Sequence, residues 1–239
     1  MLRGPGRSPD RITRKVLAGM KGAPIVARSM ARAQPANRRA RRIRRLARIA
    51  ALAATGRDGP LVSAFRAARR AGVPLRAIRE ALLQTFLFAG FHRTVNALDA
   101  LERALGPRPA GRPERVSAAA ARRRGNTLFR RVYGVDAPRV LGDLGRRHPE
   151  FRDWILADAY GKVLGRPGLA AAERECLAVA LLAALDLPRQ QVAHVRGALR
   201  CGARPAEVEA AIAAVSRIAP RRAVAFARRR LAAEGARGR

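Results

Sequence analysis

The sequence contains three histidines, and His194 is the one whose surroundings favour chemistry. It lies on a mainly apolar predicted helix, residues 190–201. A buried imidazole beside a carboxylate can carry a proton near neutral pH. Glu173 and Glu175, on the preceding predicted helix, are the candidate partners. The alternative interpretation is a core or interface histidine with one satisfied nitrogen.

The spacing between these candidates predicts an indirect contact. In an antiparallel hairpin that turns near Leu187, His194 lies opposite Ala180. Glu175 is then about 8 Å away along the helix axis, because each residue adds about 1.5 Å. We therefore expect a water bridge or a splayed hairpin if Glu175 and His194 act together.

Other catalytic patterns are missing from the sequence. The histidines and the two cysteines, Cys176 and Cys201, do not have the spacing of metal ligands. There is also no glycine-rich phosphate loop and no G-x-S-x-G motif. We therefore expect neither a metal nor a cofactor.

The elements that position the candidates are predicted to be helices throughout. Apolar residues recur every three or four positions, and Ala and Arg favour helices, whereas residues that favour strands are sparse. The fold class is therefore all-α. The predicted organisation is a basic, mostly disordered tail (1–40), a first helical unit (41–106), a Pro/Gly/Ala-rich linker (107–120) and a second helical unit (121–235).

The two units contain an internal repeat. A shift of 130 residues aligns residues 46–83 with residues 176–213 without a gap. Gly72 and Gly202 then fall at equivalent positions, each just after a predicted helix. Two copies of one helical unit are therefore the predicted architecture.

The candidate proton-transfer pair occurs in the second copy only. The first copy has Arg45 in place of Glu175 and Ala64 in place of His194. We therefore place the candidate site in the second unit and interpret the first as a structural or dimer-forming half.

The chain is arginine-rich and strongly basic, with a formal net charge of +33 over 239 residues. Residues 1–48 carry 15 basic side chains and one acidic side chain. Such a tail attracts polyanions, including nucleic acid. No aromatic residue precedes Phe65, so the tail has no side chain to stack on bases. The alternative is a compositional bias with a solvated tail.

Cysteine content and hydropathy predict a cytoplasmic protein. Two cysteines do not make a disulfide framework. The longest apolar run, residues 177–185, is about half of what a bilayer span needs. We therefore expect no membrane span and no secretory signal.

Residues 160–212 resemble the carboxymuconolactone decarboxylase family, whose other branch is alkylhydroperoxidase D. In the second unit the resemblance rests on YGKVLGRPGL (160–169), ERECLAVALLAALDL (173–187) and AHVRGALRCGARPAEVEAAI (193–212). In the first unit it rests on AGVPLRAIREALLQTFLFAGFHRTVNAL (71–98). The resemblance implies an all-α fold of two tandem alkylhydroperoxidase D-like units that assemble into a ring-like homo-oligomer.

The peroxidase branch of the family implies a thiol relay of a glutamate, a C-x-x-C pair and a histidine. Glu175 and His194 match the outer positions, but Leu187 and Gln190 stand where the cysteines would be. A thiol peroxidase needs a reactive thiolate and a resolving thiol. Alkylhydroperoxidase or peroxiredoxin-like antioxidant activity is therefore disfavoured.

The decarboxylase branch implies a lyase, or a related enzyme, that acts on a small carboxylated molecule. Glu175 and His194 would then form the proton relay, and Arg166 or Arg196 would bind the carboxylate of the substrate. The alternative is a non-catalytic helical oligomer whose basic residues 1–48 contact polyanions.

Overall fold

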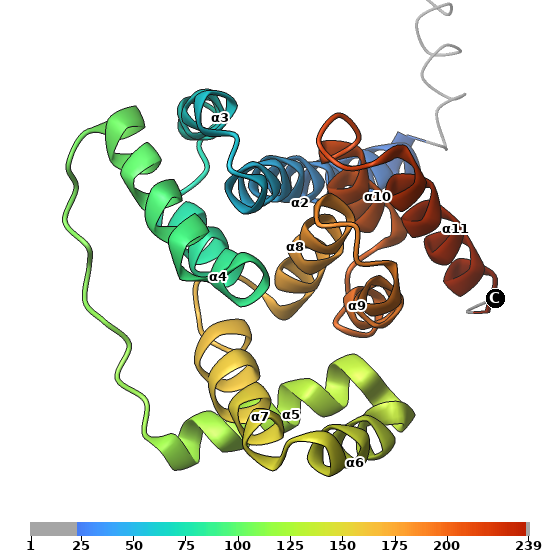
Figure 1. The fold of residues 1–239 in the computed structure, drawn as a ribbon. Coiled ribbons are helices and arrows are strands. Elements are labelled where there is room, and N and C mark those ends of the chain that lie inside the picture. Colours follow the sequence, from blue (N-terminus) through green and yellow to red (C-terminus); the bar gives the residue numbers. More distant parts are fainter. Residues whose placement is uncertain (1–22, 238–239) are drawn as a thin grey trace, which may run out of the picture. The chain divides into compact units, whose positions relative to one another are not determined.

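The computed structural model describes the backbone of residues 23–237. Its elements are α2 (Ala23–Thr55), α3 (Asp58–Arg70), α4 (Leu75–Leu105), α5 (Ala118–Tyr133), η1 (Gly134–Asp136), α6 (Ala137–Arg147), α7 (Pro149–Trp154), the π-helical segment η2 (Ile155–Leu164), α8 (Ala171–Ala184), α9 (Pro188–Arg200), α10 (Pro205–Ala214) and α11 (Arg221–Arg237). Figure 1 shows their order along the chain. The described residues contain no β-strand, which confirms the predicted all-α class.

The chain divides into two compact units, Met1–Arg39 and Ala40–Arg239. Within the described part of the first unit, the backbone forms the beginning of α2. This helix begins at Ala23, so the start predicted at Arg41 is too late. The disorder expected for the rest of the tail concerns residues 1–22, which lie outside the described residues. The core, the cavities and the candidate site belong to the second unit.

The predicted tandem repeat is confirmed by the helix bounds. Helix α3 covers Asp58–Arg70 and α9 covers Pro188–Arg200, so their ends differ by the same 130 residues. Gly72 and Gly202 follow these helices with φ of 78° and 90°. An L side chain is strained at such angles, which is why glycine ends both helices. The same three backbone hydrogen bonds close each helix end.

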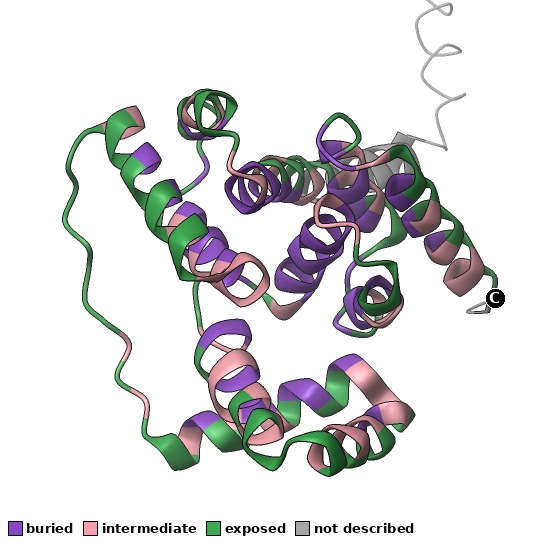
Figure 2. Ribbon diagram, viewed as in Figure 1, coloured by how far each residue is buried: buried purple, intermediate pink, exposed green. Residues whose placement is uncertain are grey.

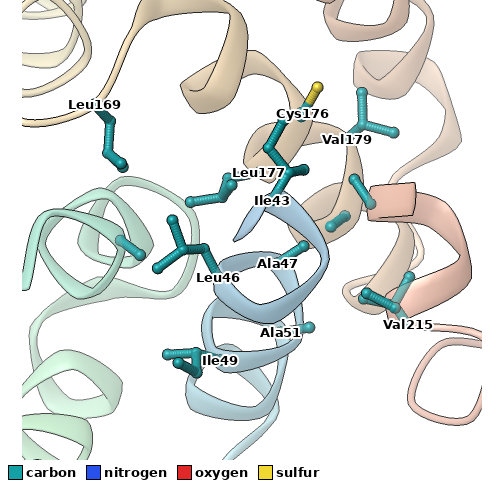
Figure 3. Packing of buried hydrophobic residues seen from close by; sticks show 14 of the residues in the cluster. Ile43, Leu46, Ala47, Ile49, Ala51, Leu169, Cys176, Leu177, Val179 and Val215 are labelled. Carbon is teal, nitrogen blue, oxygen red and sulfur yellow. The ribbon is translucent and has the colours of Figure 1, made fainter. Parts of the chain in front are cut away.

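Helix α8 is the centre of the core. Its residues from Ala172 to Ala183 are all buried, and it contacts α4, α9, α10 and α11 (Figures 1 and 2). Figure 3 shows Ile43 and Leu46 of α2 beside Leu177 of α8. A helix that is buried on every side needs an apolar sequence all round, which explains the long apolar run.

Two positions depart from regular helix geometry or capping. Gly90 has φ 79° and kinks α4. Asp136 directly precedes α6 but makes no side-chain capping bond. Its backbone is helical (φ −77°, ψ −13°) because it ends η1, whereas a capping side chain needs an extended backbone.

The connection between the two repeats has no helix from Gly106 to Val116. Helix α5 begins shortly afterwards, at Ala118. The domain division proposed around residues 107–120 stays a prediction. Among the described residues, no helix has the length and hydrophobicity needed to cross a membrane.

Candidate functional site

Glu175 and His194 are in direct contact. Nδ1 of His194 lies 2.8 Å from Oε2 of Glu175, and both residues are buried. Of the two arrangements expected from ideal helix spacing, a water bridge or a splayed hairpin, the water bridge is therefore not needed. The reason is Gly197, where an added Cβ would lie 2.7 Å from Oε2 of Glu175. With no side chain at Gly197, the carboxylate can lie against α9 and reach the imidazole.

This contact suits the tautomer of His194 that carries its proton on Nδ1. An ionised Glu175 accepts a hydrogen bond from Nδ1–H, which leaves Nε2 of His194 to exchange a proton with another molecule. The second carboxylate oxygen, Oε1 of Glu175, is buried and has no hydrogen-bond partner among the described residues. Unsatisfied buried acceptors are costly and rare in native proteins, and some mark functional sites.

Helix α8 begins with three consecutive buried charges that hold the site in place. Each bonds to a different helix: Glu173 to Arg42 of α2 at 2.8 Å, Arg174 to Glu80 of α4 at 2.7 Å, and Glu175 to His194 of α9 at 2.8 Å. Glu173 also accepts from the backbone N–H of Ala170. Glu173 is thus committed to Arg42 and the start of α8, so of the two predicted partners it is Glu175 that contacts His194.

Tyr133 and Tyr160, the two tyrosines of the chain, lie beside each other with ring centroids 6.4 Å apart, and the charge of Glu175 acts on both. Both rings pack on Phe129, with centroid distances of 4.3 and 4.9 Å. Burial raises the pKa of Tyr160 well above its usual value and also raises the pKa of Tyr133, and the charge of Glu175 adds to both shifts. Both hydroxyls therefore remain protonated at neutral pH and can act as donors. The sequence analysis missed them, although Tyr160 opens the first family-like segment.

The two thiols are unsuited to redox chemistry. Burial raises the pKa of Cys201 to about 11; the charge of Glu175 adds to the shift and Arg131 opposes it. Cys176 is fully buried. Reactive cysteines have lowered pKa values, because the thiolate is the nucleophile. Neither cysteine has the environment of a peroxidatic thiol.

A small pocket of about 160 Å³ lies next to the relay, although neither Glu175 nor His194 lines it. The link is Val132, which lines the pocket: an added Cβ at Gly197 would lie 2.6 Å from Val132 and 2.7 Å from Oε2 of Glu175. It is lined by Tyr133, by Ala193 next to His194, and by the arginines 139, 189, 196 and 200. Nε of Arg196 donates to Glu234 at 2.8 Å. Asp136 also lines the pocket and pairs with Arg139 at 3.5 Å, so the lining has a positive excess together with the phenolic hydroxyl of Tyr133.

Arg166 lies elsewhere, in a cavity of about 900 Å³ that neither Glu175 nor His194 lines. Its Nε is 3.3 Å from a carboxylate oxygen of Glu80 and 3.9 Å from one of Glu114. Of the four predicted site residues, the structure brings Glu175 and His194 together, places Arg196 in the adjoining pocket and places Arg166 in a different cavity. Within the described ranges, no group of three or more His, Cys, Asp or Glu residues is arranged to hold a metal ion.

Comparison with known proteins agrees with this architecture. The model of the carboxymuconolactone decarboxylase family matches residues 30–103 and 149–232, which correspond to the two helical repeats. "Peroxisomal protein 2" of Schizosaccharomyces pombe is 30% identical over 140 residues, which are 56% of this chain and 64% of that relative. The chain thus matches less than two thirds of the relative's length. With two family matches over most of its described helices, the chain belongs to the carboxymuconolactone decarboxylase family.

Proposed function

We propose that this chain is a lyase, or a closely related enzyme, that acts on a small carboxylated molecule through a Glu175–His194 proton relay. The observation that carries the proposal is the buried 2.8 Å contact between the two side chains, with Oε1 of Glu175 unpartnered among the described residues. A buried carboxylate–imidazole pair is suited to general acid–base catalysis.

In the proposed reaction, the bond between the substrate's ring carbon and its carboxylate breaks and carbon dioxide leaves. For a lactone substrate such as γ-carboxymuconolactone, the electron pair passes into the conjugated carbonyl system of the ring. Protonated His194 then gives its Nε2 proton to carbon. Glu175 stabilises the imidazolium and holds the ring in orientation. The proton is recovered from solvent, so the reaction is balanced without a cofactor.

Arg196 is the proposed partner of the substrate's carboxylate, because it lines the pocket that adjoins the relay. Arginine binds carboxylates through two parallel N–H donors. Tyr133 lines the same pocket and is a further proposed donor. Arg166 is given no part in this step, because it lines the other cavity and pairs with Glu80.

The test is carbon dioxide release from γ-carboxymuconolactone by the full chain. We expect release that falls by about 100-fold or more in His194→Ala, the usual effect of removing a general acid. His148→Ala is the matched control, because His148 is an exposed histidine that contacts Glu150 at 3.1 Å. No release by the folded protein would exclude this substrate, and equal release by both variants would exclude His194 as the acid.

A thiol peroxidase remains the less favoured activity for this chain. The positions of the family's cysteine pair hold Leu187 and Gln190. The thiol of Cys201, with its pKa near 11, is almost entirely protonated at neutral pH. The proton relay is therefore proposed without a thiol.

Polyanion binding is the second candidate function, and it is supported by the exposed face of α2. Arg41, Arg44 and Arg48 are exposed and lie three or four residues apart, on one side of the helix. We expect replacement of all three with Gln to weaken the salt dependence of binding to double-stranded DNA. The slope of log K against log salt concentration should fall in magnitude by up to about 3, since each phosphate contact contributes about 0.9. Gln at exposed Arg123, Arg147 and Arg229 is the matched control, and an equal reduction there would contradict a specific role of α2.

Assembly and location are further proposals. Phe91 and Trp154 have large exposed apolar side chains, which supports a homo-oligomer in which a second copy covers them. The cytoplasmic location stays a prediction, and the peroxisomal name belongs to the yeast relative.

A further inference from the structure

The cavity of about 900 Å³ is not used by the proposed relay. It lies between α4, the connecting segment from Gly106 to Glu114, and Arg166 with Pro167. Its apolar wall consists of leucines of α4, namely 75, 83, 98, 101 and 105. This volume lies within the range of pockets that hold small organic ligands.

The wall formed by the connecting segment is fixed by hydrogen bonds. Arg79 of α4 donates to the carbonyl oxygens of Pro109 at 2.6 Å and Arg108 at 3.0 Å. At the far end of the segment, Glu114 pairs with Arg124 of α5 at 2.9 Å. The segment is therefore tied to a helix at both ends, and the cavity is preformed.

The charges of the lining leave a positive excess. Five arginines and three glutamates line the cavity. Glu80 is already paired with Arg174 at 2.7 Å, and Glu114 with Arg124. Of the remaining side chains, Arg76 and Arg112 have no ion-pair partner among the described residues, whereas Glu102 is an exposed acid.

We propose that this cavity binds an amphipathic carboxylate at a site separate from the Glu175–His194 pair. The aliphatic body of the ligand packs on the leucines of α4, and the carboxylate pairs with Arg76 and Arg112. Burial of the aliphatic body provides most of the affinity, and the two guanidinium groups select the anionic head. Because Glu102 repels additional negative charge, the cavity favours a head group with a single charge.

The test is isothermal titration calorimetry of the full chain with dodecanoate below its micelle concentration, with dodecanol as the neutral probe. We expect one dodecanoate per chain, and binding weakened at least about 10-fold in Arg76→Gln/Arg112→Gln, which loses two charge-assisted contacts. Arg123→Gln/Arg147→Gln removes the same charge from exposed positions outside the cavity and is expected to bind as the wild type does.

Two matched substitutions on α4 test the role of the apolar wall. Leu98→Gln alters a lining residue, whereas Val95→Gln alters an equally exposed residue one turn away that does not line the cavity. Only Leu98→Gln is expected to weaken dodecanoate binding. Equal weakening by both arginine variants, equal binding of dodecanol, or no binding at all would overturn the proposal. His194→Ala is expected to bind normally, so this test does not depend on the proposed lyase activity.

Discussion

Replacing Arg174 with methionine is expected to lower the free energy of unfolding by about 3–5 kcal/mol, the usual cost of removing one partner of a buried ion pair. The Arg174 side chain is 1% exposed, and its Nη2 donates to Glu80 at 2.7 Å and to the carbonyl of Arg166 at 3.1 Å. Burial lowers the pKa of Arg174, and Glu80 opposes this shift. Methionine fills the space of the side chain but leaves the buried carboxylate of Glu80 with only the longer 3.3 Å contact to Arg166.

The matched control for this prediction is Arg228→Met. Arg228 pairs with Glu209 at 2.9 Å, but both side chains are about half exposed, so we expect a loss below about 1 kcal/mol. Urea unfolding followed by far-ultraviolet circular dichroism measures both variants. In Arg174→Met/Glu80→Leu, which removes both charges, much of the lost stability should return. Equal losses in Arg174→Met and Arg228→Met would contradict the buried ion pair.

Replacing Gly125 with alanine is expected to lower the free energy of unfolding by about 3 kcal/mol, near the upper end of the usual cost of overpacking. An added Cβ at Gly125 would lie 1.7 Å from the carbonyl oxygen of Leu156 in η2. At Gly161 the corresponding contact is 2.2 Å, to the carbonyl oxygen of Ala121 in α5. Backbone atoms cannot rotate away as a side chain can, so α5 and η2 must move apart.

Gly235→Ala is the control for the glycine prediction. Gly235 lies in α11, and an added Cβ there meets no atom within 4 Å. Alanine favours helix over glycine, so this variant is expected to gain up to about 1 kcal/mol. Thermal melting distinguishes the two variants, because the melting temperature should fall in Gly125→Ala and rise in Gly235→Ala. Since α5 and η2 carry Tyr133 and Tyr160, Gly125→Ala should also slow the proposed reaction. A melting temperature unchanged by Gly125→Ala would contradict the close packing of α5 on η2.

The fold was predictable because short-range sequence features mark the helix ends in both copies of the repeat. The glycines that follow α3 and α9 and the 130-residue shift place the helix ends directly, and local capping chemistry does not depend on the rest of the molecule. The start of α2 was less predictable, because its first residues have no clear apolar periodicity.

The candidate site was predictable in chemistry but not in geometry. Residue types pointed to His194 with Glu173 or Glu175, and the family resemblance selected Glu175. Ideal helix spacing called for a water bridge or a splayed hairpin, because that estimate ignores the space left by Gly197. Tyr133 and Tyr160 are distant in sequence and meet through the close packing of α5 on η2.

The arginines illustrate a second limit of sequence reasoning. With arginine at so many positions, composition does not distinguish Arg196, in the pocket beside the relay, from Arg166, which pairs with Glu80 in the other cavity. The two arginines are told apart only by the linings of their cavities, α4 with the connecting segment for Arg166 and α5, α6 and α9 for Arg196.

The relay itself is tested most directly by a double-variant cycle on the rate of carbon dioxide release. His194→Ala and Glu175→Gln should each slow release, because the first removes the acid and the second weakens its orientation and charge stabilisation. If Glu175 acts through His194, the double variant should be no slower than His194→Ala. Losses that multiply in the double variant, or a Glu175→Gln enzyme as fast as the wild type, would contradict the relay.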